Sequence, residues 1–345
     1  MSIFKLFKDV KEYNKDKDFN QEVMTWAKKG YNKNYLNVIS VPYNNSVKFL
    51  DIILNLISEN KKVLYITNED IKDIYLLKQI RKDTSFRNYC YFRGNCTNIE
   101  EKLLVITNYE NANLIEEKFF CVIYDDVSCY SDYGVGDIRN LMYKIKAVKY
   151  ITYSIESILE KGEVIEIPIK KHNIPITEPR IITTKIDINK EIPYMIYDYM
   201  KWFVKSRRKV ILYAPDRGKA DTIYEYLLGL REEISTNTIR YNDKETRKIQ
   251  KLLRVKDEPL IIVMDSMNNF HMGVNNLDIV VYFADDERYN YKKLTYICGK
   301  VGMEGRFSNS EVIFLANNTT IEMEKAKSIT RNFNKLAWER GLINI

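Results

Sequence analysis

The sequence predicts an α/β protein of two domains, each built on a mostly parallel sheet flanked by helices. Short apolar runs rich in β-branched residues alternate with amphipathic stretches, which is typical of parallel strands connected by helices. This alternation occurs in both halves of the chain, and a proline-bearing stretch separates the halves. A length of 345 residues is sufficient for two ordinary hydrophobic cores.

Five strands are predicted in the first half of the chain. They are 36–41 (LNVISV), 62–67 (KVLYIT), 103–107 (LLVIT), 120–126 (FCVIYDD) and 148–154 (VKYITYS). Between the first two, apolar residues recur at helical spacing from Val47 to Ile57. This region is therefore predicted to be a β-α-β unit.

The middle of the chain contains the predicted linker. Four prolines between Pro168 and Pro193 cannot sit inside helices, which places the linker within 165–182. The predicted organisation is an N-terminal extension (1–20), a first domain (21–182) and a second domain (183–345).

The second half repeats the pattern of the first. Its predicted strands are 209–215 (KVILYAP), 260–265 (LIIVMD), 278–284 (DIVVYFA) and 311–316 (EVIFLA). A helix ending at Leu230 follows the first of these strands. A final helix is predicted to carry Ile329, Phe333 and Leu336 on one face.

The composition favours a globular protein and permits a polyanionic partner. Hydrophobic residues make up 45% of the chain, and the formal net charge is +7. The N-terminus is too charged for a secretory signal, and no apolar run approaches the ~20 residues of a membrane span, so we expect a cytoplasmic protein without transmembrane segments. Five cysteines form no CxxC pair, so we expect reduced thiols and no metal site.

Five fragments, in order along the chain, resemble superfamily 2 helicases, and in particular the competence DNA-uptake helicase family ComFA. The most specific is 167–179 (IPIKKHNIPITEP), in which Pro168, Lys171, His172, Pro175 and Pro179 carry the likeness. The others are 210–227, 270–285 and 296–306, which resemble motifs IV, V and VI, and the closing helix within 323–343. The resemblance implies two tandem RecA-like domains, the first of which would bind ATP.

The phosphate-binding loop of that family is degenerate here. Such a loop needs glycines, so that backbone N–H groups approach the phosphates, and a lysine. No glycine occurs between Gly30 and Gly94, and the equivalent turn is PYNNS. The family's nucleotide-binding positions fall on Asn44, Asn45, Ser46 and Lys48, with Ser46 in place of the lysine. Asn44 and Asn45 tolerate left-handed turns, so we expect a tight loop without phosphate binding.

The remaining motifs are partly retained. Asp125 and Asp126 correspond to the catalytic carboxylates of motif II, with Asp126 in place of glutamate; two solvated acids at a strand end are an equally good interpretation. Thr152 and Ser154 match motif III, which couples the two domains in the family.

Motif VI should supply arginines that stabilise charge on the transferred phosphoryl group. Its two arginine positions fall on Lys300 and Met303, and Arg306 lies one helical turn further on as a possible substitute.

Three hypotheses follow from these motifs. The first is a ComFA-type pseudo-helicase that binds nucleic acid, with single-stranded DNA and other DNA-uptake proteins as partners and no cofactor. The second is an active ATP-dependent translocase with atypical motifs, which would use ATP and Mg²⁺. The third is an interaction scaffold that binds neither nucleotide nor DNA.

Overall fold

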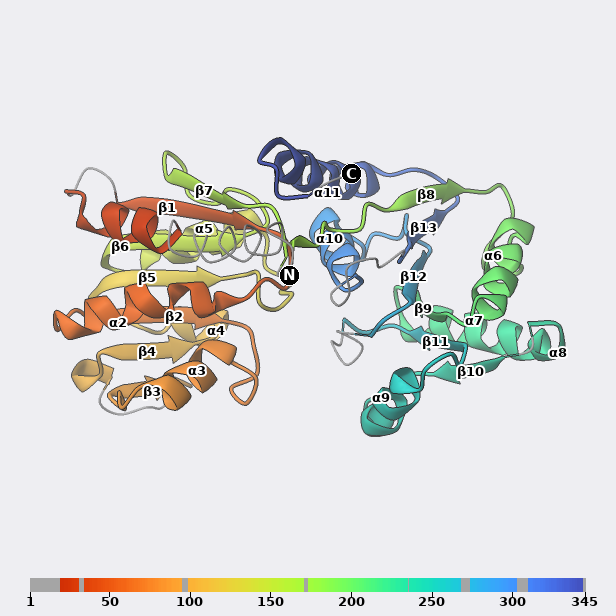
Figure 1. Ribbon diagram of the computed structural model, residues 1–345, viewed down its shortest axis with the longest axis horizontal. Coiled ribbons are helices and arrows are strands. Elements are labelled where there is room, and N and C mark those ends of the chain that lie inside the picture. Colours follow the sequence, from red (N-terminus) through yellow and green to blue (C-terminus); the bar gives the residue numbers. More distant parts are fainter. Residues whose placement is uncertain are drawn as a thin grey trace, which may run out of the picture. The chain divides into compact units, whose positions relative to one another are not determined.

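The computed structural model describes residues 19–30, 34–94, 99–170, 173–234, 236–267, 274–302 and 310–343. The chain divides into two compact units, the first ending at Ile167 and the second beginning at Pro168. Each unit is described by itself (Figure 1). Within the described ranges, no helix is both long and apolar enough to cross a bilayer.

The first unit contains a seven-stranded, fully parallel sheet with the order β3-β4-β2-β5-β6-β1-β7. Its strands are β1 (Tyr35–Ser40), β2 (Val63–Thr67), β3 (Tyr89–Tyr91), β4 (Leu104–Thr107), β5 (Phe119–Asp125), β6 (Ala147–Ser154) and β7 (Glu163–Ile167). The helices are 19–28, η1 (Ser46–Phe49), α2 (Leu50–Ser58), α3 (Tyr75–Asp83), η2 (Ile99–Glu101), α4 (Tyr109–Ala112) and α5 (Val135–Lys144).

Both faces of this sheet are covered, which explains why its central strands are largely apolar. Along β2, Val63 and Tyr65 belong to the core shared with α2 and α3, whereas Leu64 and Ile66 belong to the core shared with α5. Successive side chains of a strand point to opposite faces, so a strand between two helical layers needs apolar residues at every position.

The second unit contains a six-stranded, fully parallel sheet with the order β10-β11-β9-β12-β13-β8. Its strands are β8 (Arg180–Thr183), β9 (Lys209–Tyr213), β10 (Asn237–Arg240), β11 (Leu260–Met264), β12 (Leu277–Tyr282) and β13 (Val312–Ala316). The helices are α6 (Tyr194–Lys205), α7 (Arg217–Gly229), α8 (Arg231–Ile234), η4 (Asp243–Glu245), α9 (Thr246–Arg254), α10 (Tyr291–Gly299) and α11 (Ile321–Glu339). The predicted α/β class with two mostly parallel sheets is confirmed.

The stretch interpreted as a linker contains parts of both sheets. β7 lies beside β1 at the edge of the first sheet, and β8 pairs with β13 in the second. The units consequently divide after Ile167, earlier than the predicted boundary after Ile182. Both edge strands are short and contain charged residues, Glu163 and Glu166 in β7 and Arg180 in β8, so their sequences carry little of the buried-strand signal.

The closing helix α11 buries a slightly different face from the predicted one. Phe333 is buried as expected, but Ile329 and Leu336 are half-buried. Small residues complete the buried face: Ala326, Thr330 and Ala337 are all below 1% exposed. α10 packs against α11, and small side chains allow two helix backbones to approach closely.

A buried ion pair lies at the amino ends of β9 and β12. The guanidinium of Arg208 donates from Nε and Nη2 to the two carboxylate oxygens of Asp278, the Nη2 bond being 2.7 Å long. The side chain of Asp278 is fully buried, and its Oδ1 also accepts the backbone N–H of Glu311 at 2.7 Å. The pair therefore joins three segments of the second unit.

Candidate functional site

The loop after β1, for which the sequence predicted a degenerate phosphate-binding loop, connects β1 to the helical turn η1. Tyr43, with a φ of 61°, is its left-handed residue. Asn44 and Asn45, which tolerate this conformation, do not adopt it: Asn45 is extended, with a φ of −77°, and caps the helical turn η1. Asn side chains that bond to nearby backbone groups favour caps of this kind.

Three backbone N–H groups of this loop are bonded to acceptors within the protein. Tyr43 N donates to the carbonyl of Val127 at 2.9 Å, and Asn45 N donates to Asn44 Oδ1 at 3.1 Å. Val47 N donates to Asn45 Oδ1 at 2.8 Å. Asn44 is held in turn, since its Nδ2 donates to Ser40 Oγ at 3.0 Å. These three N–H groups, which a phosphate-binding loop would present to its ligand, are thus satisfied internally.

Lys48 and Ser46 differ in their surroundings. Ser46 is 1% exposed. The Lys48 ammonium lies 5.9 Å from the ring centroid of Phe19, on the helix 19–28 that precedes β1. Lys48 is thus engaged with the neighbouring helix.

Asp125, at the carboxyl end of β5, is buried and fully hydrogen-bonded. Its Oδ1 accepts the backbone N–H groups of Val127 at 3.0 Å and Ser128 at 2.9 Å. Its Oδ2 accepts the hydroxyl of Ser128 at 2.6 Å and the hydroxyl of Tyr65. A carboxylate offers about four lone-pair positions, so these four donors saturate it.

Asp126 is also turned inward. It is 3% exposed, and its Oδ1 accepts the hydroxyl of Ser131 at 2.7 Å. Its backbone N–H donates to the carbonyl of Tyr153 at 2.8 Å. A general base needs to reach a water molecule beside the substrate, and a buried carboxylate bonded to a serine is poorly placed to do so.

The electrostatics around Asp125 reflect its burial. Removal from water raises the pKa of Asp125, although the bonds from Ser128 and Tyr65 oppose the rise. Burial, together with the charge of Asp125, raises the pKa of Glu69 to about 8. Burial is the main cause of both raised pKa values.

Thr152 and Ser154, which the resemblance assigned to motif III, are both buried and hydrogen-bonded within the first unit. Thr152 Oγ1 donates to Asn37 Oδ1 at 2.9 Å, and Ser154 Oγ donates to the carbonyl of Glu156 at 2.6 Å. Asn37 Oδ1 also accepts the N–H groups of Ile158 and Leu159. These contacts join β1, β6 and the segment leading to β7.

The basic residues of motif VI and of the linker lie in the second unit. Lys300 is 1% exposed, and its ammonium donates to the carbonyl of Met267 at 3.1 Å. Lys170 is also buried and donates to the carbonyls of Gly299 and Val301 at 2.7 and 2.8 Å, where α10 ends. Burial lowers the pKa of Lys170 to about 7. Lys171, His172, Met303 and Arg306 lie outside the described residues.

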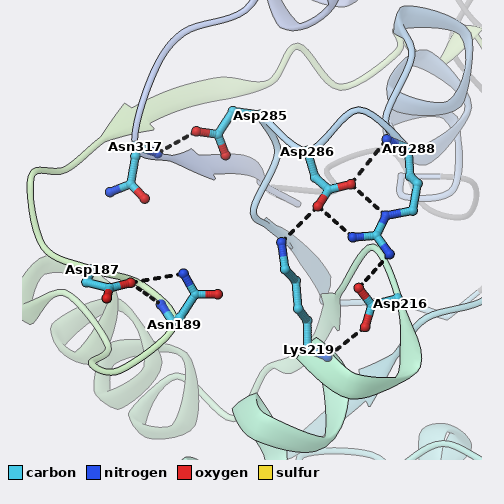
Figure 2. A network of polar contacts seen from close by, with 8 residues as sticks. All are labelled: Asp187, Asn189, Asp216, Lys219, Asp285, Asp286, Arg288 and Asn317. Carbon is cyan, nitrogen blue, oxygen red and sulfur yellow. Dashed lines mark hydrogen bonds and ion pairs between the residues drawn. The ribbon is translucent and has the colours of Figure 1, made fainter.

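A polar network lies at the carboxyl edge of the second sheet (Figure 2). Asp216 caps α7 and pairs with Arg288 at 2.6 Å. Asp286 binds Arg288 through both oxygens, at 2.6 and 2.7 Å, and Lys219 at 2.8 Å. These bonds hold the pKa of Asp286 well below its usual range. The sequence analysis did not single out this network, although PDRGK and DDER each follow an apolar strand and so point to one sheet edge.

The helix α9 presents a basic face that the sequence analysis also missed. Its buried residues are Ile249 and Leu253, whereas Arg247, Lys251 and Arg254 are exposed. The three exposed residues follow i, i+4, i+7 spacing and so share one face. The TRKIQKLLR pattern could have revealed this face, because three apolar residues and four basic ones are interspersed at helical spacing.

Metal-ligand chemistry is not apparent among the described residues, since no group of three His, Cys, Asp or Glu side chains there could hold an ion. The cysteines in this part of the chain, Cys90, Cys121, Cys129 and Cys298, are free thiols. Burial raises the pKa of Cys121 to about 12. That thiol is therefore protonated and unreactive at neutral pH.

No protein-family model matches the sequence, and no curated protein shows a significant match. Among solved structures, the protein is similar to the DUF1998 helicase MrfA bound to DNA, with a TM-score of 0.52 and 14% identity over 93% of this chain and 51% of that one. It is also similar to RecG bound to a three-way DNA junction, with a TM-score of 0.52 and 15% identity over 94% of this chain and 46% of that one. The chain spans about half the length of each. Such identities show the fold alone, and that fold is the pair of RecA-like domains of helicases.

Proposed function

We propose that the protein is a helicase-like nucleic-acid-binding protein that has lost ATP turnover. The observation that carries the proposal is the saturation of Asp125 by four protein donors. Helicases of this fold class use a carboxylate at this strand end to hold Mg²⁺ beside the nucleotide. Here, Mg²⁺ binding would first have to break the hydrogen bonds that Tyr65 and Ser128 donate to Asp125. A site whose carboxylate is already free to bind the ion does not have this free-energy cost.

The loop after β1 supports the same proposal. Three of its N–H groups are bonded within the chain, and its lysine position is the buried Ser46. Triphosphate binding would have to replace these bonds without a charged partner at the β- and γ-phosphates. The missing glycines and lysine of the loop, the altered carboxylate of motif II and the missing arginines of motif VI should together leave little ATP hydrolysis.

The basic face of α9 supports nucleic-acid binding. Arg247, Lys251 and Arg254 present three cationic side chains on one side of an exposed helix. Such faces bind phosphates without sequence preference, and the affinity falls steeply with salt because counterions are released. A single strand is the partner we propose.

The biological setting follows from the resemblance at 167–179. A ComFA-like linker between two RecA-like domains favours a role in DNA uptake or processing, together with other proteins of that process, in the cytoplasm. In this role the protein would hold a strand or a partner and would not drive translocation itself.

The proposal predicts salt-sensitive DNA binding without ATP hydrolysis. Anisotropy of a labelled single-stranded oligonucleotide should show binding at low ionic strength, and phosphate release should stay at background with or without DNA. Replacing Arg247 and Lys251 by glutamine should weaken binding and flatten the log–log salt dependence by about 1.4, because each strand contact contributes ~0.7.

A matched control removes the same charge elsewhere in the second unit. Lys201→Gln with Lys205→Gln, on α6, should leave the salt slope unchanged. Absence of binding by the unaltered protein would favour the scaffold hypothesis. DNA-stimulated phosphate release that is lost in Asp125→Asn would instead establish the active-translocase hypothesis.

A further inference from the structure

A pocket of about 360 Å³ lies at the amino ends of the strands of the first sheet. It is bounded by the helix 19–28, by the end of α2 and by the beginnings of β5 and β6. Four of its lining residues are Lys28, Lys29, Lys61 and Lys149, and we call it the lysine pocket. The loop after β1 and Asp125 lie at the carboxyl ends of the same strands, so the lysine pocket is separate from the candidate site.

The charge of the lysine pocket is strongly positive. Its one lining carboxylate, Glu59, pairs with Lys61. Lys29 pairs at 2.7 Å with Glu163, which does not line the pocket. Four lysines against these two carboxylates leave a surplus of two positive charges. A phosphate monoester carries about −1.5 to −2 at neutral pH and so matches this surplus better than a carboxylate does.

Lys149 is held in a fixed position at the wall of the pocket. It is 2% exposed, and its ammonium donates to the carbonyl of Lys29 at 2.8 Å and lies 5.0 Å from the ring centroid of Trp26. Burial lowers the pKa of Lys149, and an anion beside it would offset that effect. A cation held by packing loses little conformational entropy when a ligand binds.

The remaining walls of the pocket are mostly apolar. They include Met24, Leu56, Val148 and the ring of Phe120, over which the Lys61 ammonium lies at 4.2 Å. Inorganic phosphate would leave these surfaces without a partner. Pockets of ~300 Å³ or more accept organic ligands, and apolar walls with a few convergent polar groups are their usual composition.

We propose that the lysine pocket binds an organic phosphate monoester, with the phosphate among the lysines and the organic body against Phe120 and the apolar wall. The ligand can be a free nucleoside monophosphate or the 5′-phosphate end of a nucleic-acid strand, since both present this group. The inference does not rest on the proposed function, because it concerns residues away from α9 and from the candidate nucleotide site.

Calorimetric titration of the full chain tests the proposal with adenosine monophosphate, adenosine and inorganic phosphate. Adenosine monophosphate should bind more tightly than either of the others. Lys28→Gln with Lys61→Gln should weaken its binding by about tenfold or more, as expected for the loss of charge-assisted contacts. Both side chains are at least partly exposed, so folding should be preserved. Lys149→Met, checked for folding by circular dichroism, should weaken binding similarly.

The control variant Lys78→Gln with Lys82→Gln removes the same charge from α3 and should bind as the unaltered protein does. Two oligonucleotides of one sequence, with a 5′-phosphate or a 5′-hydroxyl, separate the two ligand sources. If the unaltered protein prefers the 5′-phosphate oligonucleotide and the Lys28/Lys61 variant does not, the ligand of the pocket is the 5′-phosphate end of a strand. If the unaltered protein binds both oligonucleotides equally, the ligand is a free nucleotide. Binding through α9 affects both oligonucleotides equally. The proposal is overturned if adenosine monophosphate binds no better than adenosine, or if the Lys28/Lys61 variant binds it unchanged.

Discussion

Replacing Asp278 by alanine is expected to lower the free energy of unfolding of the second unit by about 3–5 kcal/mol. Arg208 is 9% exposed and donates to both oxygens of Asp278, so the substitution leaves a guanidinium buried without its anion. The N–H of Glu311 loses its acceptor in the same step. The loss comes from the buried charge that remains, and so Arg208→Met in the Asp278→Ala background should restore part of the stability.

Chemical denaturation combined with hydrogen exchange measures this effect unit by unit. Peptides from β9 and β12 should exchange faster in Asp278→Ala, whereas peptides from β2 and β5 in the first unit should not. Glu339→Ala serves as the control, because Glu339 forms an exposed pair with Lys335 at 3.8 Å and exposed pairs contribute at most ~1 kcal/mol. Equal effects of the two substitutions would contradict a structural role for the buried pair.

Replacing Asp125 by alanine is expected to destabilise the first unit by about 2–4 kcal/mol, because several donors in the interior lose their acceptor. The hydroxyl of Tyr65 is fully buried, and the N–H groups of Val127 and Ser128 form the turn after β5. Asp125→Asn keeps an oxygen for the two N–H groups and should cost about half as much. Thermal and denaturant unfolding with probes in β2 and β5 measure both changes.

Whether Asp125→Ala lowers or raises the free energy of unfolding distinguishes a structural carboxylate from a catalytic one. Removing a carboxylate from an acidic metal site relieves repulsion and commonly stabilises the metal-free protein, at the expense of activity. Asp125→Ala with unchanged or raised stability would therefore return Asp125 to a catalytic role. Because Tyr65, Ser128 and Val127 donate hydrogen bonds to Asp125, we expect the substitution to lower the stability of the first unit.

The buried strands were predictable because they carry a strong local signal. β2, β5, β9 and β12 lie inside their sheets between helical layers, so most of their positions face a core and are apolar. β7 and β8 face solvent on part of their surface and carry charges, so their sequences resemble an extended linker. The placement of β8 depends on pairing with β13, a contact between residues far apart in the sequence.

The candidate site likewise combines features that the sequence predicts with features that depend on tertiary contacts. The sequence by itself determined which residues stand at the ends of β1 and β5, and that glycines and a lysine are missing there, because residue type and order are local properties. The tertiary structure alone decided that Asp125 is saturated, since its donor Tyr65 comes from the neighbouring strand β2. It also brought Lys149 to the end of the helix 19–28, where the lysine pocket forms. Hydrogen bonds and charge clusters between strands depend on pairing and register, which periodicity along one segment does not specify.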